Sequence, residues 1–417
     1  MSLAGRSNRA GIFAPFTVRS FRFQWPSDLL TSWGIEMEVL ILGWYILTTT
    51  GSVLLLTIYG SLQYAGTLIA PIFGLAGDRF GHRNVLCLMR LVYSSLAASI
   101  MLLSLTGLLT PVLALIIAGA NGLVRPSDLA MRNALVAETI PGDRLMAAMG
   151  VDRTTSDSGR VVGPLLGAFL MAVFGMTFAY TVITTFYTVG CTLTLGVGAG
   201  RSAATSLGRL SFWRDLGEGL TYIWDSPESL AAMWLAFLVN MTAYPLTLGL
   251  LPYVAQDIYH VGQEGLSTLT ASFAIGSLTG SVGISAAGRS IRPARMMMCF
   301  CVVWYAMLLG FIFSPGIVTG RMMLVLAGLS QSLSMVPMAV MLLHGAGAKF
   351  RGRVMGVRML AIYGLPVGLL CAGWLIPRFG FIPIATVYCI VGALLTLGIG
   401  VRWRKALWPL NVTANAR

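Results

Sequence analysis

Acidic side chains stand inside the first long apolar stretch of this sequence, where an ionised group is costly unless it is paired or hydrated. Glu36 and Glu38 lie within residues 24–48. At 1.5 Å per helical residue, Glu36 lies about 17 Å from Trp25, near the middle of a hydrocarbon layer that is roughly 30 Å thick. A carboxylate at that depth can take up and release a proton or bind a cation. We therefore treat Glu36 as a candidate functional residue.

The two glutamates cannot serve one cavity. Glu36 and Glu38 are about 200° apart around an α-helix. One of them is expected to line a path through the protein, and the other is expected to face a neighbouring helix.

A second set of charges falls in the stretches 110–131 and 146–173. It comprises Arg125, Asp128, Asp152, Arg153, Asp157 and Arg160. Arg153, Asp157 and Arg160 follow i, i+4, i+7 spacing, so they share one helix face with alternating sign and can neutralise one another. Two interpretations stay open: a structural ion network between two helices, or a site in which Arg160 meets an anionic solute or acts on Glu36.

Weaker candidates for functional residues are the aromatic, amide and thioether side chains within apolar stretches. Such side chains suit contact with amphipathic molecules. Taken singly, each is more often a packing residue. The predicted cavity-lining residues are Trp33, Tyr45, Asn240, Tyr244, Gln331 and Met335.

The elements that position these residues follow from composition. The chain is 56% hydrophobic and 10% charged, with a mean hydropathy of +0.80, whereas soluble proteins carry about 25% charged residues. A bilayer accepts that apolar surface and favours helices, because backbone groups must pair internally. We predict an all-α membrane protein with twelve transmembrane helices, near 24–48, 53–76, 86–107, 110–131, 146–173, 175–198, 228–254, 265–287, 296–314, 320–345, 354–377 and 380–401.

The net charge of +13 is carried mainly by arginines in short gaps between apolar stretches, as orienting charges are. In the predicted topology, the outer loops hold only Arg321 and Arg378. The other Lys and Arg residues of the loops, including Arg132 and Arg358, fall in the loops on the opposite side of the membrane. Both termini are therefore predicted on the cytoplasmic side of a cytoplasmic (inner) membrane. No long Lys/Arg run suggests nucleic-acid binding.

A polar stretch divides the predicted helices into six and six. We predict an N-terminal half at 1–199, an amphipathic cytoplasmic linker at 200–227, and a C-terminal half at 228–417 with a short basic tail. No carboxylate falls within a predicted span of the second half.

The sequence lacks the residue patterns that metal binding, ATP binding and enzymatic catalysis require. Six cysteines stand without CxxC spacing, and three histidines are dispersed, so no metal site is predicted. No G-x-x-x-x-G-K-S/T motif for ATP phosphates occurs. Without a convergent nucleophile, base or metal set, we expect neither an enzyme nor a cofactor.

The run 74–83, GLAGDRFGHR, matches a known sequence signature in detail. It resembles the loop signature G-x-L-A-D-R-x-G-R-R/K of the major facilitator superfamily, with Gly77 and His82 as departures. The resemblance implies two pseudo-symmetric six-helix bundles and a charge latch with neighbouring helix ends that holds an inward-closed state. The corresponding second-half loop, 287–295, has lost its acid. The implied latch residues are Gly74, Asp78, Arg79, Gly81 and Arg83.

The run 159–168, GRVVGPLLGA, resembles the G-P-x-x-G motif of antiporters and efflux members, which assigns Gly163, Pro164 and Gly167 to gating. Together with RPSD at 125–128, PGDRL at 141–145 and RGRVM at 351–355, it is similar to the enterobactin-exporter-like branch. Arg125 stands where that branch often has Asn, and the superfamily's upstream span-four Arg is absent, which weakens a proton-relay role there.

The resemblance implies a monomeric, proton-coupled exporter of a small amphipathic or anionic molecule, siderophore-like or drug-like, that works by alternating access. Its partners would be the solute, protons and the bilayer. Two alternatives stay open: an importer of a nutrient or metal chelate with the same fold, and, more remotely, a non-transporting membrane receptor or scaffold.

Overall fold

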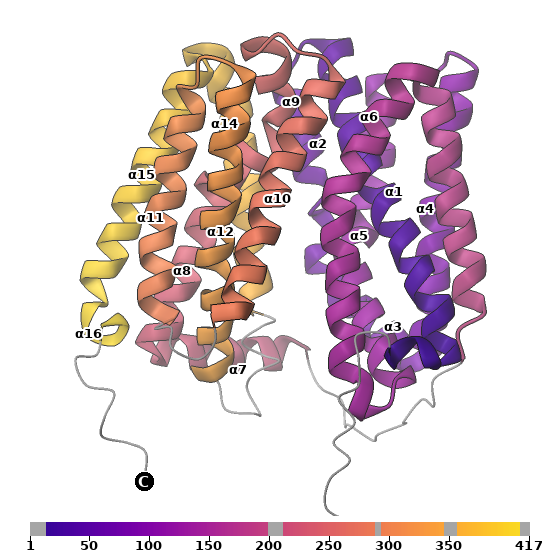
Figure 1. The fold of residues 1–417 in the computed structure, drawn as a ribbon, viewed down its shortest axis with the longest axis horizontal. Coiled ribbons are helices and arrows are strands. Elements are labelled where there is room, and N and C mark those ends of the chain that lie inside the picture. Colours follow the sequence, from indigo (N-terminus) through magenta and orange to yellow (C-terminus); the bar gives the residue numbers. More distant parts are fainter. Residues whose placement is uncertain (1–13, 199–211, 288–292, 346–356, 409–417) are drawn as a thin grey trace, which may run out of the picture. The chain divides into compact units, whose positions relative to one another are not determined.

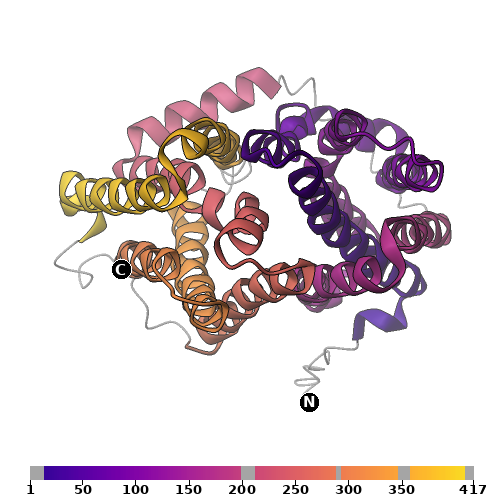
Figure 2. The same ribbon diagram turned by 90° about the horizontal axis from the view of Figure 1, so that it is seen from above.

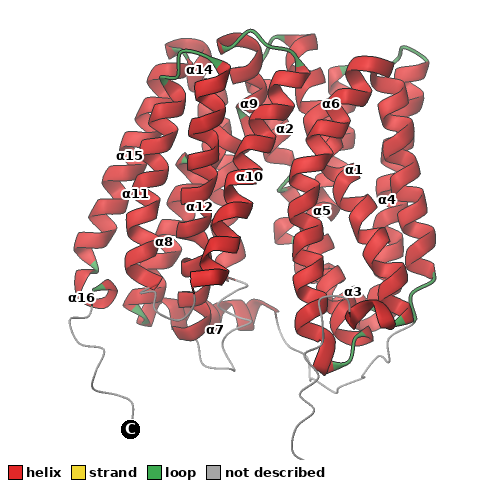
Figure 3. Ribbon diagram, in the orientation of Figure 1, coloured by secondary structure: helices red, strands yellow, loops and turns green. Residues whose placement is uncertain are grey.

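The computed structural model describes residues 14–198, 212–287, 293–345 and 357–408. Within those ranges the chain forms helices and short turns, without strands (Figure 3). The helices of the first half are η1 (Ala14–Thr17), α1 (Arg19–Thr50), α2 (Val53–Leu62), η2 (Ala65–Leu68), α3 (Ala70–Phe80), α4 (His82–Leu105), α5 (Pro111–Thr139) and α6 (Gly142–Leu195).

The later helices include two π-helical turns, η3 and η4, either side of the short α9. They are α7 (Phe212–Asp225), α8 (Pro227–Thr242), η3 (Pro245–Gly249), α9 (Leu251–Tyr253), η4 (Val254–Ile258), α10 (Gln263–Ala287), α11 (Pro293–Ile312), α12 (Ile317–Gly345), η6 (Ala361–Tyr363), α14 (Gly364–Phe379), α15 (Phe381–Arg402) and α16 (Arg404–Leu407).

Nine helices in the described ranges are long and apolar enough to cross a membrane, and α2 to α3 forms a tenth, broken stretch that bends by 47°. One of the nine, α6, has 54 residues and bends at Gly175, where φ is 80° and ψ is 176°. At about 81 Å it is long enough for two spans, and its bend falls at the predicted boundary between 146–173 and 175–198. The all-helical membrane class is confirmed, and the count of twelve stays a prediction.

Single glycines turn the chain between consecutive helices. Gly81 ends α3 and precedes α4 with φ of 86°, and Gly380 does the same between α14 and α15 with φ of 83°. These left-handed backbone angles favour glycine, because a Cβ atom would be strained there. Two helices can therefore reverse direction within one residue.

The described chain divides into two compact units (Figures 1 and 2). Unit 1 comprises Met1–Val39, Ile69–Leu109 and Val124–Thr205, and unit 2 comprises Leu40–Leu68, Thr110–Leu123 and Ser206–Arg417. Within unit 2, α7 runs crosswise to α8, α11 and α12 (Figure 1). The predicted division at 200–227 stays a prediction.

Two arginines that were expected in loops lie in helices instead. Arg132 is in α5, which continues to Thr139, and only 3% of the residue is exposed. Arg358 belongs to the membrane-length helical stretch Val357–Phe379. The loop assignment of Arg132 was wrong, because hydropathy ends a span where charge begins, whereas the helix continues if the charge finds partners. Arg358 was counted with a loop but falls within the predicted span 354–377, and its helical position agrees with that span.

Candidate functional site

Glu36 and Arg125 form an ion pair within unit 1, which we call the coupling pair. α1 supplies the carboxylate and α5 supplies the guanidinium, and Glu36 Oε1 lies 3.7 Å from Arg125 Nη2. Their side chains are 25% and 24% exposed. The pair is therefore loose and partly accessible, so it can be broken by a proton or by a competing ion more easily than a buried pair.

The Gly-Pro motif of α6 packs against α1 at the coupling pair. A Cβ atom on Gly163 would lie 2.7 Å from Glu36 Cβ, and one on Gly167 would lie 3.1 Å from Met37 Cα. Pro164 stands between them inside α6 and is buried. Small residues permit this close approach, so a movement of α6 against α1 would move the backbone that carries Glu36.

Glu38 points away from the coupling pair. Its side chain is buried, and its Oε2 accepts a hydrogen bond of 3.0 Å from the Tyr187 hydroxyl of α6. A Cβ atom on Gly34 would lie 2.8 Å from the Tyr187 ring, so glycine one turn earlier makes room for this partner. The two glutamates thus lie on different faces of α1, with Glu38 against a neighbouring helix.

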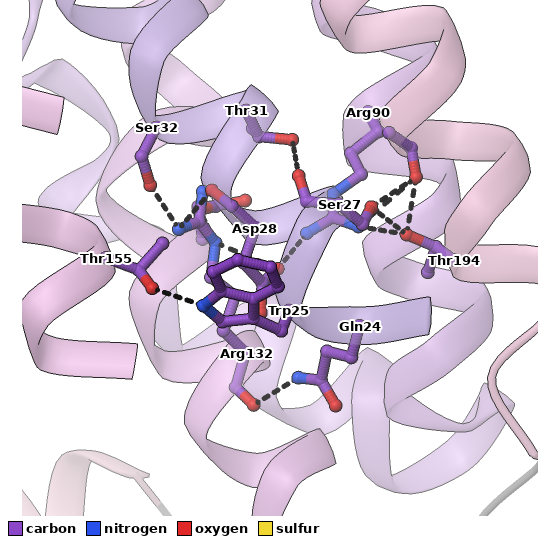
Figure 4. Close-up of polar contacts among 12 residues, drawn as sticks. Gln24, Trp25, Ser27, Asp28, Thr31, Ser32, Arg90, Arg132, Thr155 and Thr194 are labelled. Atoms are coloured by element: carbon purple, nitrogen blue, oxygen red, sulfur yellow. Dashed lines mark hydrogen bonds and ion pairs between the residues drawn. The ribbon is translucent and has the colours of Figure 1, made fainter. Parts of the chain in front are cut away.

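Unit 1 buries five charged residues besides Glu38, which we call the charge cluster: Asp28, Arg90, Asp128, Arg132 and Asp152. Arg90 of α4 is fully buried, pairs with Asp28 of α1, and donates to the hydroxyls of Ser27 and Thr194 (Figure 4). Its charge therefore connects α4, α1 and α6.

The second arginine of the charge cluster extends it to α5. Arg132 Nε lies 2.5 Å from Asp128 Oδ2 and 3.6 Å from Asp28 Oδ1. Arg132 Nη1 also donates to Ser32 Oγ at 2.7 Å (Figure 4). Asp152 of α6 interacts electrostatically with Asp28 and Arg132. Three carboxylates and two guanidinium groups thus make up the cluster.

Neutral side chains next to the charge cluster form further hydrogen bonds between its helices. Gln24 Nε2 donates to the Arg132 carbonyl at 3.2 Å, and Trp25 Nε1 donates to Thr155 Oγ1 at 3.0 Å (Figure 4). Sequence reasoning missed Asp28 and Arg90. The available signal was Arg90 itself, because an arginine within a span requires a carboxylate nearby, and Asp28 stands near the start of the first span.

The charges expected on one face of α6 do pair along the helix. Arg153 Nε lies 3.2 Å from Asp157 Oδ2, and Arg160 Nη1 lies 4.0 Å from Asp157 Oδ1. The two arginine side chains are 62% and 56% exposed. The structure therefore brings Arg125, rather than Arg160, to Glu36.

In the loop signature, His82 occupies the centre of a charged contact. His82 Nδ1 lies 2.6 Å from Glu138 Oε1 of α5, and His82 Nε2 lies 3.8 Å from Asp78 Oδ1. The Asp78 side chain is 75% exposed, while that of His82 is 12% exposed. A Cβ atom on Gly77 would lie 2.6 Å from the His82 ring, so the two departures from the signature fit each other.

The other signature residues lie at the surface of the same turn. Arg79 lies over the Phe80 ring at 5.4 Å, and Arg83 Nη1 donates to the Val197 carbonyl at 3.1 Å. Gly81 makes the turn, and a Cβ atom on Gly74 would meet open space.

The predicted cavity-lining residues fall into both units. In unit 1, Trp33 Nε1 donates to Ser158 Oγ at 3.3 Å. In unit 2, Gln331 Nε2 donates to the Tyr244 hydroxyl at 2.9 Å, and Asn240 donates to the Ala236 carbonyl at 2.8 Å. Tyr45 and Met335 are half-buried. Among the described residues, no three His, Cys, Asp or Glu side chains are grouped to hold a metal ion.

Membrane-length helices that enclose paired charges are the architecture of a multi-pass membrane protein. The sequence model of the Major Facilitator Superfamily matches residues 25–369. The chain belongs to that family. No curated protein matches it closely enough to count as a relative.

Solved structures agree on the fold. The POT family transporter PepTSo has a TM-score of 0.75 and 11% identity, covering 94% of this chain and 99% of that one. The nucleoside transporter NupG has a TM-score of 0.71 and 13% identity over 94% and 100%. The D-xylose-proton symporter has a TM-score of 0.69 and 12% identity over 91% and 96%. At these identities the likeness concerns the fold alone.

Proposed function

We propose that this protein is a proton-coupled exporter of a small amphipathic or anionic molecule, and that Glu36 is its proton-binding residue. The observation that supports this role is the coupling pair itself. Among the described carboxylates of unit 1, Glu36 combines a position near the middle of a long apolar helix with partial exposure and an arginine partner 3.7 Å away. The charge cluster, in contrast, is buried.

The pair has two electrostatic states. With Glu36 ionised, its charge balances that of Arg125 and holds α1 against α5. A proton on Glu36 removes the attraction, so Arg125 has to draw closer to other groups or to water. In the proposed cycle, solute occupies the protein while the pair is closed, and protonation of Glu36 accompanies the return step.

Contacts around Glu36 link this chemistry to alternating access. Gly163 packs on the Glu36 Cβ atom, and the same glycine belongs to the motif that resembles those of antiporters and efflux members. A change in the pair would therefore act on the α1 and α6 contact directly. We further propose a cytoplasmic membrane location with both termini in the cytoplasm, and a monomeric transporter rather than an enzyme.

The test uses purified protein in proteoliposomes that contain a pH-sensitive dye. Salicylate, an iron-free catecholate siderophore and ethidium are added in turn, and the solute that moves most protons is kept. Glu36→Gln should abolish solute-driven proton movement while the unfolding midpoint stays unchanged. Glu264→Gln, at the start of α10, is the matched control and should keep it.

Direction is measured in inside-out membrane vesicles, whose cytoplasmic face is on the outside. Solute uptake into these vesicles that is driven by an acidic vesicle interior supports export, whereas solute accumulation with proton entry in intact cells supports the importer. Proton movement that persists in Glu36→Gln would remove Glu36 from the mechanism.

A further inference from the structure

His82 is a titratable residue at the meeting point of three helix ends in unit 1. It is the first residue of α4 and directly follows Gly81, the turn residue after α3. Its ring contacts Glu138, the second-last residue of α5. The His82 side chain is 12% exposed. A change in the charge of this ring therefore acts on α3, α4 and α5 together.

The two ring nitrogens of His82 face two different carboxylates. Nδ1 lies 2.6 Å from Glu138 Oε1, and Nε2 lies 3.8 Å from Asp78 Oδ1 of α3. An ionised carboxylate only accepts hydrogen bonds, so a neutral ring that donates from Nδ1 turns the lone pair of Nε2 toward Asp78. A protonated ring carries a hydrogen on both nitrogens and attracts both acids. The contact with both helices therefore requires the protonated ring.

The cations around this turn are directed to other partners. Arg19 of α1 and Arg79 of α3 each lie over a phenylalanine ring of their own helix, at 6.0 Å and 5.4 Å. Arg83 of α4 donates to the carbonyl that follows the end of α6, at 3.1 Å. Among the described residues, the ion pairs of the His82 ring are those with Asp78 and Glu138. The ring is thus the cation that joins these two acids.

Helix ends act in the same place. The C-terminal ends of α3 and α5 carry partial negative charge, so a cation between them attracts both ends, whereas the start of α4 opposes it. Glu138 is 26% exposed and Asp78 is 75% exposed. The contact with α5 is therefore the stronger of the two, since water screens the acid on α3 more.

We propose that His82 makes the latch of the loop signature dependent on pH, because a proton on the ring joins the α3–α4 turn to the end of α5 and its loss releases them. Histidine is the side chain whose charge ordinarily changes between about pH 5 and 8. The contact is complete at acidic pH, where the ring is charged, and is lost as the pH rises through that range. The arginine usual at this position of the signature carries its charge throughout.

The direction of the effect on transport rests on the proposed function. The resemblance implies that the latch holds the inward-closed state, and the α3–α4 turn is predicted on the cytoplasmic side. An exporter that exchanges its solute for protons brings protons into the cytoplasm. A latch that closes in acid then slows the exporter as those protons accumulate. His82 would therefore limit proton entry.

The latch is measured by hydrogen–deuterium exchange of the full chain in lipid nanodiscs at about pH 5.5 and about pH 8, which bracket histidine titration. Neither solute nor gradient is present, and each rate is divided by the intrinsic rate at that pH. The signal is read over the α3–α4 turn and the end of α5. His82→Gln removes the charge, His82→Arg makes it permanent, and Glu138→Gln removes the nearer acid. His260→Asn is the control, because His260 is exposed and has φ of 50°, which asparagine tolerates.

In the wild type and in His260→Asn, protection of the turn should be roughly three- to tenfold greater at the acidic pH. His82→Gln and His82→Arg should each lose this pH dependence, and Glu138→Gln should lose most of it. Equal wild-type protection at the two pH values, or a pH dependence that survives in His82→Gln, would overturn the proposal. The Glu36→Gln assay measures proton movement driven by solute, whereas exchange is measured without solute. The two proposals therefore fail separately.

Discussion

Unit 1 and unit 2 bury different kinds of polar side chain. In the described ranges, the buried charged residues are Asp28, Glu38, Arg90, Asp128, Arg132 and Asp152, and all six belong to unit 1. Unit 2 buries hydroxyls and amides instead, such as Ser272, Ser330 and Gln263. The two units therefore differ in the polar groups that they bury among apolar helices: unit 1 buries charges, and unit 2 buries neutral groups.

The difference determines what joins the helices. Ser272 donates to the Thr268 carbonyl at 2.7 Å and Ser330 donates to the Leu326 carbonyl at 2.8 Å, each within its own helix. Such bonds satisfy the hydroxyl without a partner on a neighbouring helix. A guanidinium cannot be satisfied in that way, so Arg90 takes partners from α1 and α6. Unit 1 is thus fixed by directional charge contacts.

Unit 2 relies on close approach of backbones. A Cβ atom on Gly276 of α10 would collide with the Val325 carbonyl of α12, and one on Gly328 would collide with the Phe273 carbonyl. Glycine pairs of this kind bring helices together by shape, without specifying one charge partner. We expect helix contacts in unit 2 to adjust more easily than those that the charge cluster holds in unit 1.

Removal of one charge from the cluster should have the largest effect. Asp28→Asn leaves Arg90 and Arg132 with one carboxylate fewer in a buried site, and such a loss costs about 3–5 kcal/mol. Arg153→Gln is the matched control, because its pair with Asp157 is 62% exposed on the arginine side and should cost roughly 0–1 kcal/mol. The free energy of unfolding in mixed micelles measures both.

Equal losses in Asp28→Asn and Arg153→Gln would show that the cluster is no stronger than a surface pair. A double substitution separates the effect of the unpaired charge from the effect of lost packing. If Asp28→Leu combined with Arg90→Met regains stability relative to Asp28→Asn, the penalty arises from the uncompensated charge rather than from lost packing.

An intermediate effect is expected in unit 2. Gly276→Leu should destabilise the protein by about 1–3 kcal/mol, because the new side chain meets the α12 backbone rather than a flexible side chain. Gly283→Leu on the same helix is the control, since a Cβ atom there meets nothing within 4 Å. Similar unfolding free energies for the two variants would contradict packing by backbone approach.

The sequence was sufficient for the class of fold and for much of the first half. Apolar stretches and the run 74–83 predicted a helical membrane protein related to the superfamily, because hydropathy and local spacing are properties of neighbouring residues. Helical geometry in the same way predicted that Glu36 and Glu38 lie on different faces, without saying which of the two meets a neighbouring helix. The partner of Glu38, Tyr187, more than a hundred residues away, did not follow from that geometry.

Residues that depend on distant partners were missed. Arg132 was assigned to a loop because a charge ends an apolar window, although it lies in the charge cluster. Arg160 was favoured over Arg125 as the neighbour of Glu36, since depth along a helix can be counted, whereas rotation toward another helix cannot. Pairing across helices requires coordinates.

The smallest expected effect concerns a place where glycine packing and charge meet in unit 1. Gly77 and His82 both depart from the loop signature, and a Cβ atom on Gly77 would lie 2.6 Å from the His82 ring. Gly77→Ala alone should therefore cost about 1 kcal/mol, whereas Gly77→Ala with His82→Arg should cost less than the two single changes together. Gly74→Ala, in open space, should be neutral or slightly stabilising. Additive unfolding free energies would mean that the two departures are unrelated. A coupling would show that unit 1 uses glycine to make room for the His82 ring between Asp78 and Glu138, where unit 2 uses glycine to bring backbones together.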